Sequence, residues 1–498
     1  MSYATVPPVI PHQTTLSNYS NIGLCKAYVY NIERSEQAQQ LLQNAQREGR
    51  KVAFRGGGNS LHDQAQGTEW VAQLNLPKFV YGLKPDSIRA SATTTWPEVW
   101  HHSKTYHQVP GVVPNTEQAT LGGTLSANCL CQFSPIIGKE SNGIESFVLL
   151  TPNGEKVEVS RPGPNSTPEE VALFQGVVGG LGSLGLVTEV QHRLLSFPFE
   201  GPAQVQTHVT HTPTTEELIR KLVDAHHATH SEERDKTLPW YGFKALPKPS
   251  PLGVLHNDGY GCLIEKEFVP ETSALSPFIF HTPKTLQNIV GNMIVMAPGV
   301  GNLFWKKLHS DWKRRTKPYM DNIHDTLFSM EGNRTARKLL GRLGLDTLCP
   351  QQTFVLPIGD NKNPYQPSLL FMEAVFRALR DSNFQPSLID MLTLPKDSIA
   401  LSSTRNMDGL AITLSFQEFG TTRLPKLKRM LQELSQRCAE VGGRVHLVKN
   451  VFVEQELLGE MYEEGLQEWK KLKDALDPNR VLVSRLFERL FPSYMESA

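Results

Sequence analysis

A run of three glycines is the first stretch of this sequence whose residue types could do chemistry. It reads Arg55-Gly56-Gly57-Gly58-Asn59-Ser60 and follows the strand-like apolar residues 51–54. Without a Cβ in the way, successive backbone N–H groups of such a run can converge on an anion. The stretch lacks the Lys-Ser/Thr ending of a Walker A loop, and no apolar helical run follows it as a GxGxxG loop requires. It therefore predicts either an anion site or a tight turn.

Two later stretches share this chemistry. Residues 176–190 contain five glycines within ten residues and run directly into an apolar strand. Residues 111–129 are dense in small and hydrogen-bonding side chains, namely Pro114, Thr116, Thr120, Gly122, Gly123, Ser126 and Asn128. Each stretch alone is weak evidence, but their order and spacing favour one shared binding surface.

Composition limits the classes of function. A chain of 498 residues is too long for one compact core, so two domains are expected. Lys plus Arg and Asp plus Glu number 50 each, and this balance argues against a nucleic-acid partner. With 39% hydrophobic and 20% charged residues, the chain has the composition of an ordinary globular protein.

Cysteine usage and the lack of targeting signals favour the cytoplasm. Six scattered cysteines show no zinc spacing, so we expect reduced thiols and no metal. The N-terminus has no basic segment followed by an apolar one, as a secretory signal would. The most apolar stretch, residues 288–305, contains Asn, Pro and Gly and is a poor membrane span. A peripheral membrane contact or a lid over an apolar substrate is left open for it.

The chemistry-bearing stretches need strands and helices to position them. The pattern predicts a helix over 33–50 and strands over 51–54, 71–76, 87–96, 145–160 and 184–195, with a hairpin turn at Asn153-Gly154. The character changes near residue 200. Beyond it, strands are expected over 353–358, 388–395 and 410–419, and amphipathic helices over 367–382 and 423–443. Antiparallel strands flanked by helices indicate a second domain of the α+β class.

The motifs together resemble the FAD-binding domain of the vanillyl-alcohol oxidase/p-cresol methylhydroxylase family. They are "RGGGNS", "PNTEQATLGG" and "GSLGLVTEV", in this order, followed near the C-terminus by "DPNRVLVSRL". The resemblance implies an α+β, two-domain FAD-binding fold whose substrate domain is built on an antiparallel sheet. It divides the chain into an FAD-binding domain (1–199), a substrate domain (200–443) and a C-terminal segment that returns to the first domain (444–498).

The same resemblance implies which residues contact FAD. The first glycine loop would bind the pyrophosphate, the second stretch would wrap the adenosine and flavin, and the third would close the site. The implied contacts are Arg55, Gly56, Gly57, Gly58, Asn59, Ser60, Asp63, Pro114, Thr116, Thr120, Gly122, Gly123, Ser126, Asn128, Gly182, Gly185, Leu186 and Val187.

FAD is expected to be held without a covalent bond. Many relatives attach it through a histidine in the first loop, but this sequence has Asn59 there, and an amide has no nucleophilic ring nitrogen. A thioether from Cys129 or Cys131 is the alternative, and a small buried thiol is the simpler interpretation.

Within the family, the decaprenylphosphoryl-ribose oxidases are the group that the sequence most resembles. "RGGGNSLHDQA" keeps their acidic residue as Asp63, and residues 351–357 and 442–450 resemble their substrate strand and lysine segment. The resemblance places Lys449 beside the flavin ring as a catalytic residue, and Gln351 and Thr353 in the substrate pocket. Leu130 stands where that group has a histidine, so the identity of the substrate stays open.

These implications predict an oxidoreductase that transfers hydride from an alcohol carbon of a small molecule to flavin N5. The substrate would be sugar-like or a hydroxylated apolar compound. Lys449 could orient the hydroxyl, stabilise charge on the reduced ring or accept the hydroxyl proton. Two alternatives are an NADPH-dependent alkene reductase, as in the sterol reductases, and a flavin-holding protein without redox turnover.

Overall fold

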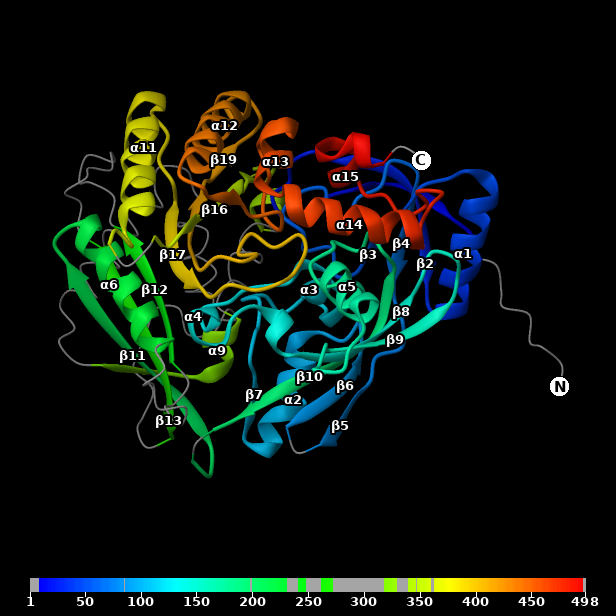
Figure 1. Ribbon diagram of the computed structural model, residues 1–498, viewed down its shortest axis with the longest axis horizontal. Helices are drawn as coiled ribbons and strands as arrows, with labels where there is room; N and C mark the ends of the chain where they lie inside the picture. The colour runs from blue at the N-terminus through cyan, green and yellow to red at the C-terminus, as the bar shows by residue number, and fades with distance from the viewer. Residues whose placement is uncertain are drawn as a thin grey trace.

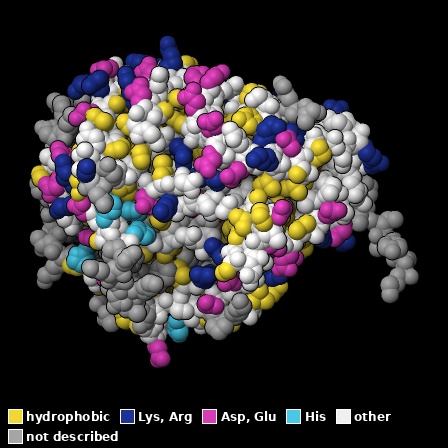
Figure 2. Space-filling view, in the orientation of Figure 1, with side chains coloured by type: hydrophobic (Ala, Val, Ile, Leu, Met, Phe, Trp, Pro, Cys, Tyr) yellow, Lys and Arg dark blue, Asp and Glu magenta, His cyan; other side chains and the backbone are white. Residues whose placement is uncertain are grey.

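The computed structural model describes residues 9–84, 86–197, 199–230, 241–247, 261–271, 318–328, 339–345, 347–359 and 362–495. The apolar stretch 288–305 lies outside these residues. Within the described residues, three larger sheets organise the fold, two in the N-terminal part and one in the part that follows (Figure 1). Charged side chains of both signs are interspersed over the face shown in Figure 2.

A four-stranded sheet carries the first glycine loop. Its strand order is β1 (His12–Leu16), β2 (Cys25–Ile32), β4 (Trp70–Leu74) and β3 (Val52–Arg55). Strands β2, β4 and β3 are parallel, and helix α1 (Ser35–Glu48) makes the crossover that such pairing requires. Because β3 ends at Arg55, the glycine run begins directly at the carboxyl end of the strand.

The second sheet is antiparallel and carries the third glycine stretch. Its strands are β5 (Val80–Lys84), β6 (Ser87–Ser91), β10 (Leu186–Ser196), β8 (Ile144–Leu150) and β9 (Lys156–Ser160), and β7 (Gln108–Pro110) also pairs with β10. The predicted hairpin at Asn153-Gly154 is confirmed, since it joins β8 to β9 with Gly154 at φ +90°. Helices α2 (Trp96–Ser103), α3 (Leu121–Ala127) and α5 (Pro168–Val177) come from the connections of this sheet.

The third sheet has eight antiparallel strands and draws on residues 203–445. Its order is β14 (Tyr319–Asp321), β11 (Ala203–Thr212), β13 (Gly261–Pro270), β12 (Tyr241–Pro247), β17 (Leu388–Leu394), β18 (Gly409–Ser415), β16 (Gln351–Pro357) and β20 (Arg444–Val445). Helices α6 (Thr215–Thr229), α11 (Gln366–Ser382) and α12 (Leu424–Glu440) pack against it (Figure 1). The predicted α+β class and the antiparallel sheet of the second part are confirmed. Strand β20 extends this sheet two residues beyond the predicted boundary at 443.

The C-terminal segment lies against the N-terminal part of the chain. Helices α13 (Gln455–Met461), α14 (Glu463–Leu476) and α15 (Arg485–Leu490) belong to it, and α14 packs on α5 (Figure 1). The residues that follow α14 are hydrogen-bonded to β3. The Val52 N–H of β3 donates to Val481 O (2.7 Å), and the Val483 N–H donates to Val52 O (3.0 Å). Residues 481–483 therefore extend the sheet that holds the first glycine loop.

Short elements complete the fold. They are α4 (Ser134–Ile137), α9 (Ile323–Leu327), β15 (Thr347–Leu348), β19 (Glu418–Phe419) and three single-turn 3₁₀ helices at Lys104–Tyr106, Glu140–Asn142 and Pro492–Tyr494. Among the helices of the described residues, none is both long and apolar enough to cross a membrane.

Candidate active site

The first glycine loop is held at its base by its neighbours. The Arg55 guanidinium donates to Ser17 O (2.8 Å) and Ala65 O (3.4 Å), and Gln73 Nε2 donates to Gly56 O (2.8 Å). Arg55 was predicted to contact the cofactor. In the structure it fixes the loop to the surrounding backbone, and a direct contact stays a prediction.

The first and second stretches approach each other so closely that positions 56 and 57 have no room for a side chain. Asn59 Nδ2 donates to Gln118 O at 2.6 Å. A Cβ on Gly57 would lie 2.2 Å from the same oxygen, and one on Gly56 would lie 2.8 Å from Thr120 Oγ1. The glycines at 56 and 57 are therefore required by this close approach. Asn59, which stands where relatives have a histidine, joins the two loops.

The second and third stretches also meet. Leu181 N–H donates to Ser126 O (2.8 Å), and Gly179 N–H donates to Leu125 O (3.0 Å). Helix α3 of the second stretch begins at the N-cap Thr120 and ends at Asn128, whose φ is +44°. Gly182 also has positive φ, at +73°. The three stretches thus contact one another in the fold, and the binding surface that their order and spacing favour stays a prediction.

Several polar groups of the first loop have no hydrogen-bond partner among the described residues. Ser60 Oγ is buried and has no hydrogen-bond partner in the described part of the chain. Within the same residues, the backbone N–H groups of 56–58 and of Ser60 donate to no other backbone group. Buried polar groups normally find partners, so this cluster of donors fits a bound anion. The pyrophosphate of FAD is such an anion, and the residues present fit it.

Other predicted contacts serve the scaffold. Asp63 accepts two hydrogen bonds from the Arg489 guanidinium on α15, at 2.8 and 2.9 Å. The side chains of Leu186 and Val187 are buried in the core, and a Cβ on Gly185 would meet Leu150 O at 2.8 Å. For these residues a contact with FAD stays a prediction.

The remaining predicted contacts lie on the second stretch. Pro114 and Thr116 are in the loop between β7 and α3, Gly122 and Gly123 are in the first turn of α3, and Ser126 is in its last turn. Thr120 Oγ1 accepts from the Gly123 N–H at 3.3 Å. Any contact that these residues make with FAD also stays a prediction.

Lys449 lies where the two parts of the molecule meet. Its Nζ donates to Gln351 Oε1 (3.3 Å) at the start of β16. Its backbone carbonyl accepts from Gln64 Nε2 (2.8 Å), which follows the first glycine loop by four residues. Burial lowers the pKa of Lys449, an effect that Asp390 and Cys129 partly oppose. An ammonium that titrates more easily than usual therefore stands beside the glycine-loop surface.

A polar row crosses the sheet next to Lys449. Thr353 on β16 is paired with Thr413 on β18, and Thr413 is paired with Asp390 on β17. The two threonine hydroxyls are 2.8 Å apart. Gln351 precedes Thr353 by two residues and so lies on the same face of the sheet. Gln351 and Thr353 were predicted to line the substrate pocket, and the structure brings both into this cluster with Lys449.

Asp390 and Thr413 were not predicted. The available signal was the sequence 388–394, LIDMLTL, in which one carboxylate interrupts an apolar strand. Which neighbours that carboxylate meets depends on the register of three strands, and this cannot be read from one strand alone.

An apolar cluster adjoins the polar row. Val355, Ala411, Leu392 and Leu394 form it, and Leu130 and Met407 pack against it. Leu130 occupies the place where the resembling oxidases have a histidine. Its apolar contacts show that Leu130 extends the apolar cluster beside the polar row and supplies no polar side chain there.

The two cysteines beside Leu130 are not activated. Burial raises the pKa of Cys129 and of Cys131, so both favour the thiol form. Cys131 is buried, with its Sγ 3.8 Å from Gly111 O. These surroundings favour the simple thiol over a thioether to the flavin.

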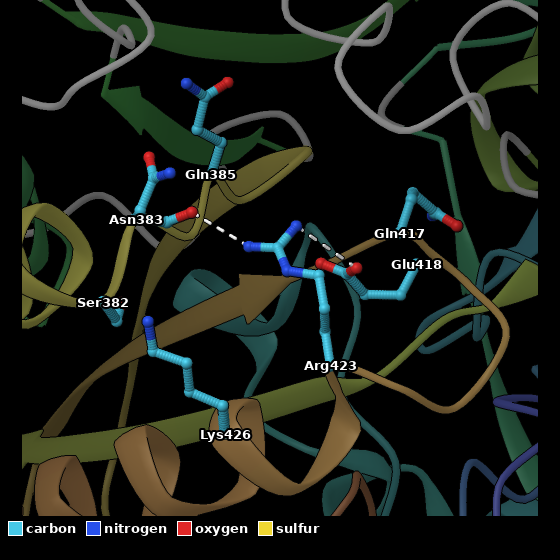
Figure 3. A pocket seen from close by; sticks show the side chains of 7 residues that line it. All are labelled: Ser382, Asn383, Gln385, Gln417, Glu418, Arg423 and Lys426. Carbon is cyan, nitrogen blue, oxygen red and sulfur yellow. Dashed lines mark hydrogen bonds and ion pairs between the residues drawn. The ribbon is translucent and has the colours of Figure 1, made fainter.

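A separate pocket is lined by residues at the end of α11, around β19 and at the start of α12 (Figure 3). It has a volume of about 400 Å³ and is lined by Ser382, Asn383, Gln385, Gln417, Glu418, Arg423 and Lys426. Arg423 crosses it, donating to Asn383 O (2.9 Å) and pairing with Glu418 (3.5 Å) (Figure 3). None of the predicted site residues lines it, so it is a different feature from the site around Lys449.

Comparison with known proteins agrees with this geometry. Residues 27–160 match the FAD binding domain family, and residues 377–490 match the D-arabinono-1,4-lactone oxidase family. The first match includes the first two glycine-rich stretches, and the second includes Asp390, Thr413 and Lys449.

Individual relatives are oxidoreductases. Decaprenylphosphoryl-beta-D-ribose oxidase of Mycolicibacterium smegmatis is 23% identical over 90% of each chain. Cytokinin dehydrogenase 9 of Oryza sativa subsp. japonica is 29% identical over 28% of this chain and 27% of its own. An uncharacterized oxidoreductase of Rhodococcoides fascians is 28% identical over 29% of this chain and 32% of its own. On these matches the chain is an FAD-binding oxidoreductase, and FAD is its cofactor.

Proposed function

We propose that the protein is an FAD-dependent oxidoreductase of the vanillyl-alcohol oxidase type that oxidises an alcohol carbon of a small molecule. The observation that carries this proposal is the position of Lys449. Its backbone is bound to Gln64, just past the first glycine loop, while its ammonium group lies on Gln351 of the third sheet. An ammonium at this junction can reach a hydroxyl held between the flavin surface and the sheet.

In this proposal, different residues bind FAD and act on the substrate. Ser60 and the N–H groups of 56–58 would hold the pyrophosphate, and the surface formed with the second and third stretches would hold the remainder of FAD. Bound FAD supplies a hydride acceptor, flavin N5, for the alcohol carbon. Lys449, whose Nζ is hydrogen-bonded to Gln351, orients the substrate hydroxyl and, as the neutral amine that its lowered pKa favours, accepts the hydroxyl proton.

The substrate proposed is a sugar-like or hydroxylated compound with an apolar portion. The polar row can receive hydroxyl groups, and the apolar cluster around Leu130 and Val355 can receive the rest. One relative is named decaprenylphosphoryl-beta-D-ribose oxidase, and residues 377–490 match the D-arabinono-1,4-lactone oxidase family; both names support a sugar-derived substrate. We further propose a cytoplasmic protein that can contact a membrane surface, and FAD held without a covalent bond.

Anaerobic reduction of the flavin tests the reaction type. We expect the yellow absorbance of the holoprotein to bleach on addition of a hydroxylated substrate such as D-arabinono-1,4-lactone, and to persist with NADPH. Bleaching by NADPH alone would instead indicate the alkene reductase. A flavin that no alcohol or lactone bleaches, although dithionite does, would indicate a protein without redox turnover.

A further inference from the structure

One carboxylate oxygen of the polar row has no partner. Asp390 Oδ1 is buried and accepts no hydrogen bond in the part of the chain that the structure describes. Transferring a carboxylate out of water without compensating donors is costly, so such a group in a folded protein needs an explanation. The proposed function treats the polar row only as a whole and assigns no substrate group to Asp390, so this oxygen stays unexplained by it.

The surroundings of Asp390 point to a ligand with donors. Across the sheet it is paired with Thr413, whose hydroxyl is engaged with that of Thr353 at 2.8 Å. Directly paired cross-strand residues have Cβ atoms about 4.5–5.5 Å apart, so the carboxylate lies beside this hydroxyl pair. Leu392, two residues further along β17, belongs to the apolar cluster on the same face. A molecule lying on this face would meet a carboxylate, two hydroxyls and an apolar wall.

We propose that Asp390 is a specificity-determining residue that accepts a hydrogen bond from a second hydroxyl of the substrate. This rests on the proposed function, because it places the reacting hydroxyl at Lys449 and a further hydroxyl at Asp390. Substrates with one hydroxyl would then leave the carboxylate unpaired and bind poorly, as sites with buried polar groups discriminate strongly.

A hydroxyl fits this position better than an ammonium group. The protonated form of Lys449 places a positive charge close enough to Asp390 for the two to interact. A second cation in the same small cluster would be repelled by it. The neighbouring threonines, in contrast, exchange hydrogen bonds readily with substrate hydroxyls.

Ligand binding can be measured apart from turnover. Holoprotein is titrated with methyl β-D-ribofuranoside, which has three hydroxyls, and with 3-hydroxytetrahydrofuran, which has one. The change in flavin absorbance on binding gives Kd, and anaerobic bleaching gives turnover. The variants are Asp390→Asn, Asp390→Leu and, as a matched control, Asp381→Asn, whose carboxylate is exposed on α11. FAD content is recorded for each variant to show that the fold is kept.

We expect Asp390→Asn and Asp390→Leu to raise Kd for the riboside by about tenfold or more, the loss of one charge-assisted hydrogen bond. Kd for 3-hydroxytetrahydrofuran should change less than about twofold, and Asp381→Asn should match the unaltered protein. Equal changes for both ligands, no change for either, or no binding of the riboside to the unaltered protein would overturn the role of Asp390. A riboside that binds with this dependence on Asp390 but never bleaches the flavin would refute only the proposed oxidation.

Discussion

Lys449 combines the features that a proton-accepting residue needs. It sits in the turn after β20, where the Gln64 amide donates to both Leu447 O (2.9 Å) and Lys449 O (2.8 Å). A lysine is better suited than an arginine here, because burial shifts the pKa of an ammonium readily while a guanidinium stays charged. The fixed backbone and the contact with Gln351 leave Nζ few alternative positions.

Replacement of this lysine tests its role. We expect Lys449→Met to keep FAD bound and to lower kcat by about a hundredfold or more, the usual worth of a positioned general base. Lys449→Arg should restore charge but little activity. In the unaltered protein, log(kcat/KM) should rise with pH up to a pKa below the ordinary 10.5 of lysine, because the neutral amine is the active form. Unchanged rates in Lys449→Met would remove Lys449 from the mechanism.

At the scale of single residues, the sequence predicted the groups whose role follows from local motifs. Gly56 and Gly57 were among these, because a run of glycines by itself indicates that another group approaches the backbone closely. Asp390 and Thr413 were not, because their meeting depends on the register of β16, β18 and β17. Arg55 was predicted to contact FAD because of its place in the motif, but its guanidinium donates to Ser17 O and Ala65 O.

At the scale of elements, the C-terminal segment links two of the glycine-rich stretches. Lys473 Nζ on α14 donates to Asp477 Oδ2 (2.6 Å), Ser183 O (2.7 Å) and Leu482 O (2.6 Å), and the ammonium is fully buried. Ser183 belongs to the third glycine-rich stretch, and Leu482 is bridged to Val52 of β3, which leads into the first. Lys473 thus fixes the spacing of both loops without being in either.

Removing this ammonium should disturb both loops. We expect Lys473→Met to lower the free energy of unfolding by about 3–5 kcal/mol, because it leaves the buried Asp477 carboxylate without its ion-pair partner. FAD affinity should fall with it. Thermal unfolding of apoprotein and holoprotein, with FAD titrations, gives both quantities.

The control is Lys470→Met, one turn earlier, which breaks the partly exposed Lys470–Asp474 pair (2.7 Å). Such a pair contributes about 0–1 kcal/mol. If the two variants were equally stable and bound FAD equally well, the link through Lys473 would have no role in cofactor binding.

The elements themselves were largely predictable. Strands expected at 71–76, 145–160, 184–195 and 388–395 correspond to β4, β8 with β9, β10 and β17. Each of these strands has an alternating or apolar pattern within its own residues, and such a local pattern is enough to predict a strand. The order of the strands was not predictable, since β12 lies beside β17 although more than a hundred residues separate them in the chain.

At the scale of the whole molecule, the site exists only where the two parts are docked. Asn450 joins them by accepting from Ser20 Oγ (2.9 Å) and donating to Leu61 O (3.1 Å). A buried ion pair, Lys139 with Asp397 (2.8 Å), adds a second junction. Contacts between segments 250 or more residues apart carry no local signal, which is why the sequence pointed to the residues of the site but not to these junctions.

We expect one buried histidine, His192, to make the stability of the whole molecule sensitive to acid. Burial lowers the pKa of His192 from 6.5 to about 4; its Nδ1 is 2.7 Å from Arg193 O, and its Nε2 has no partner in the described residues. As pH falls, the unfolded chain binds this proton before the folded one does. The stability present above pH 6.5 is therefore lost progressively as pH falls toward about 4.

We expect His192→Gln to flatten the dependence of the unfolding temperature on pH in this range. The exposed His101→Gln should leave the dependence unchanged. A slope identical in His192→Gln and the unaltered protein would show that His192 does not contribute to acid lability.

Non-covalent binding of FAD at the glycine loop can be measured by the absorbance spectrum of the purified protein, taken before and after acid precipitation. We expect flavin bands in the native protein and complete release of FAD into the acid supernatant, because Asn59 offers no nucleophile and both nearby cysteines favour the thiol form. A protein that stays colourless after incubation with FAD would contradict the glycine-loop site. Flavin retained in the precipitate would contradict its non-covalent attachment.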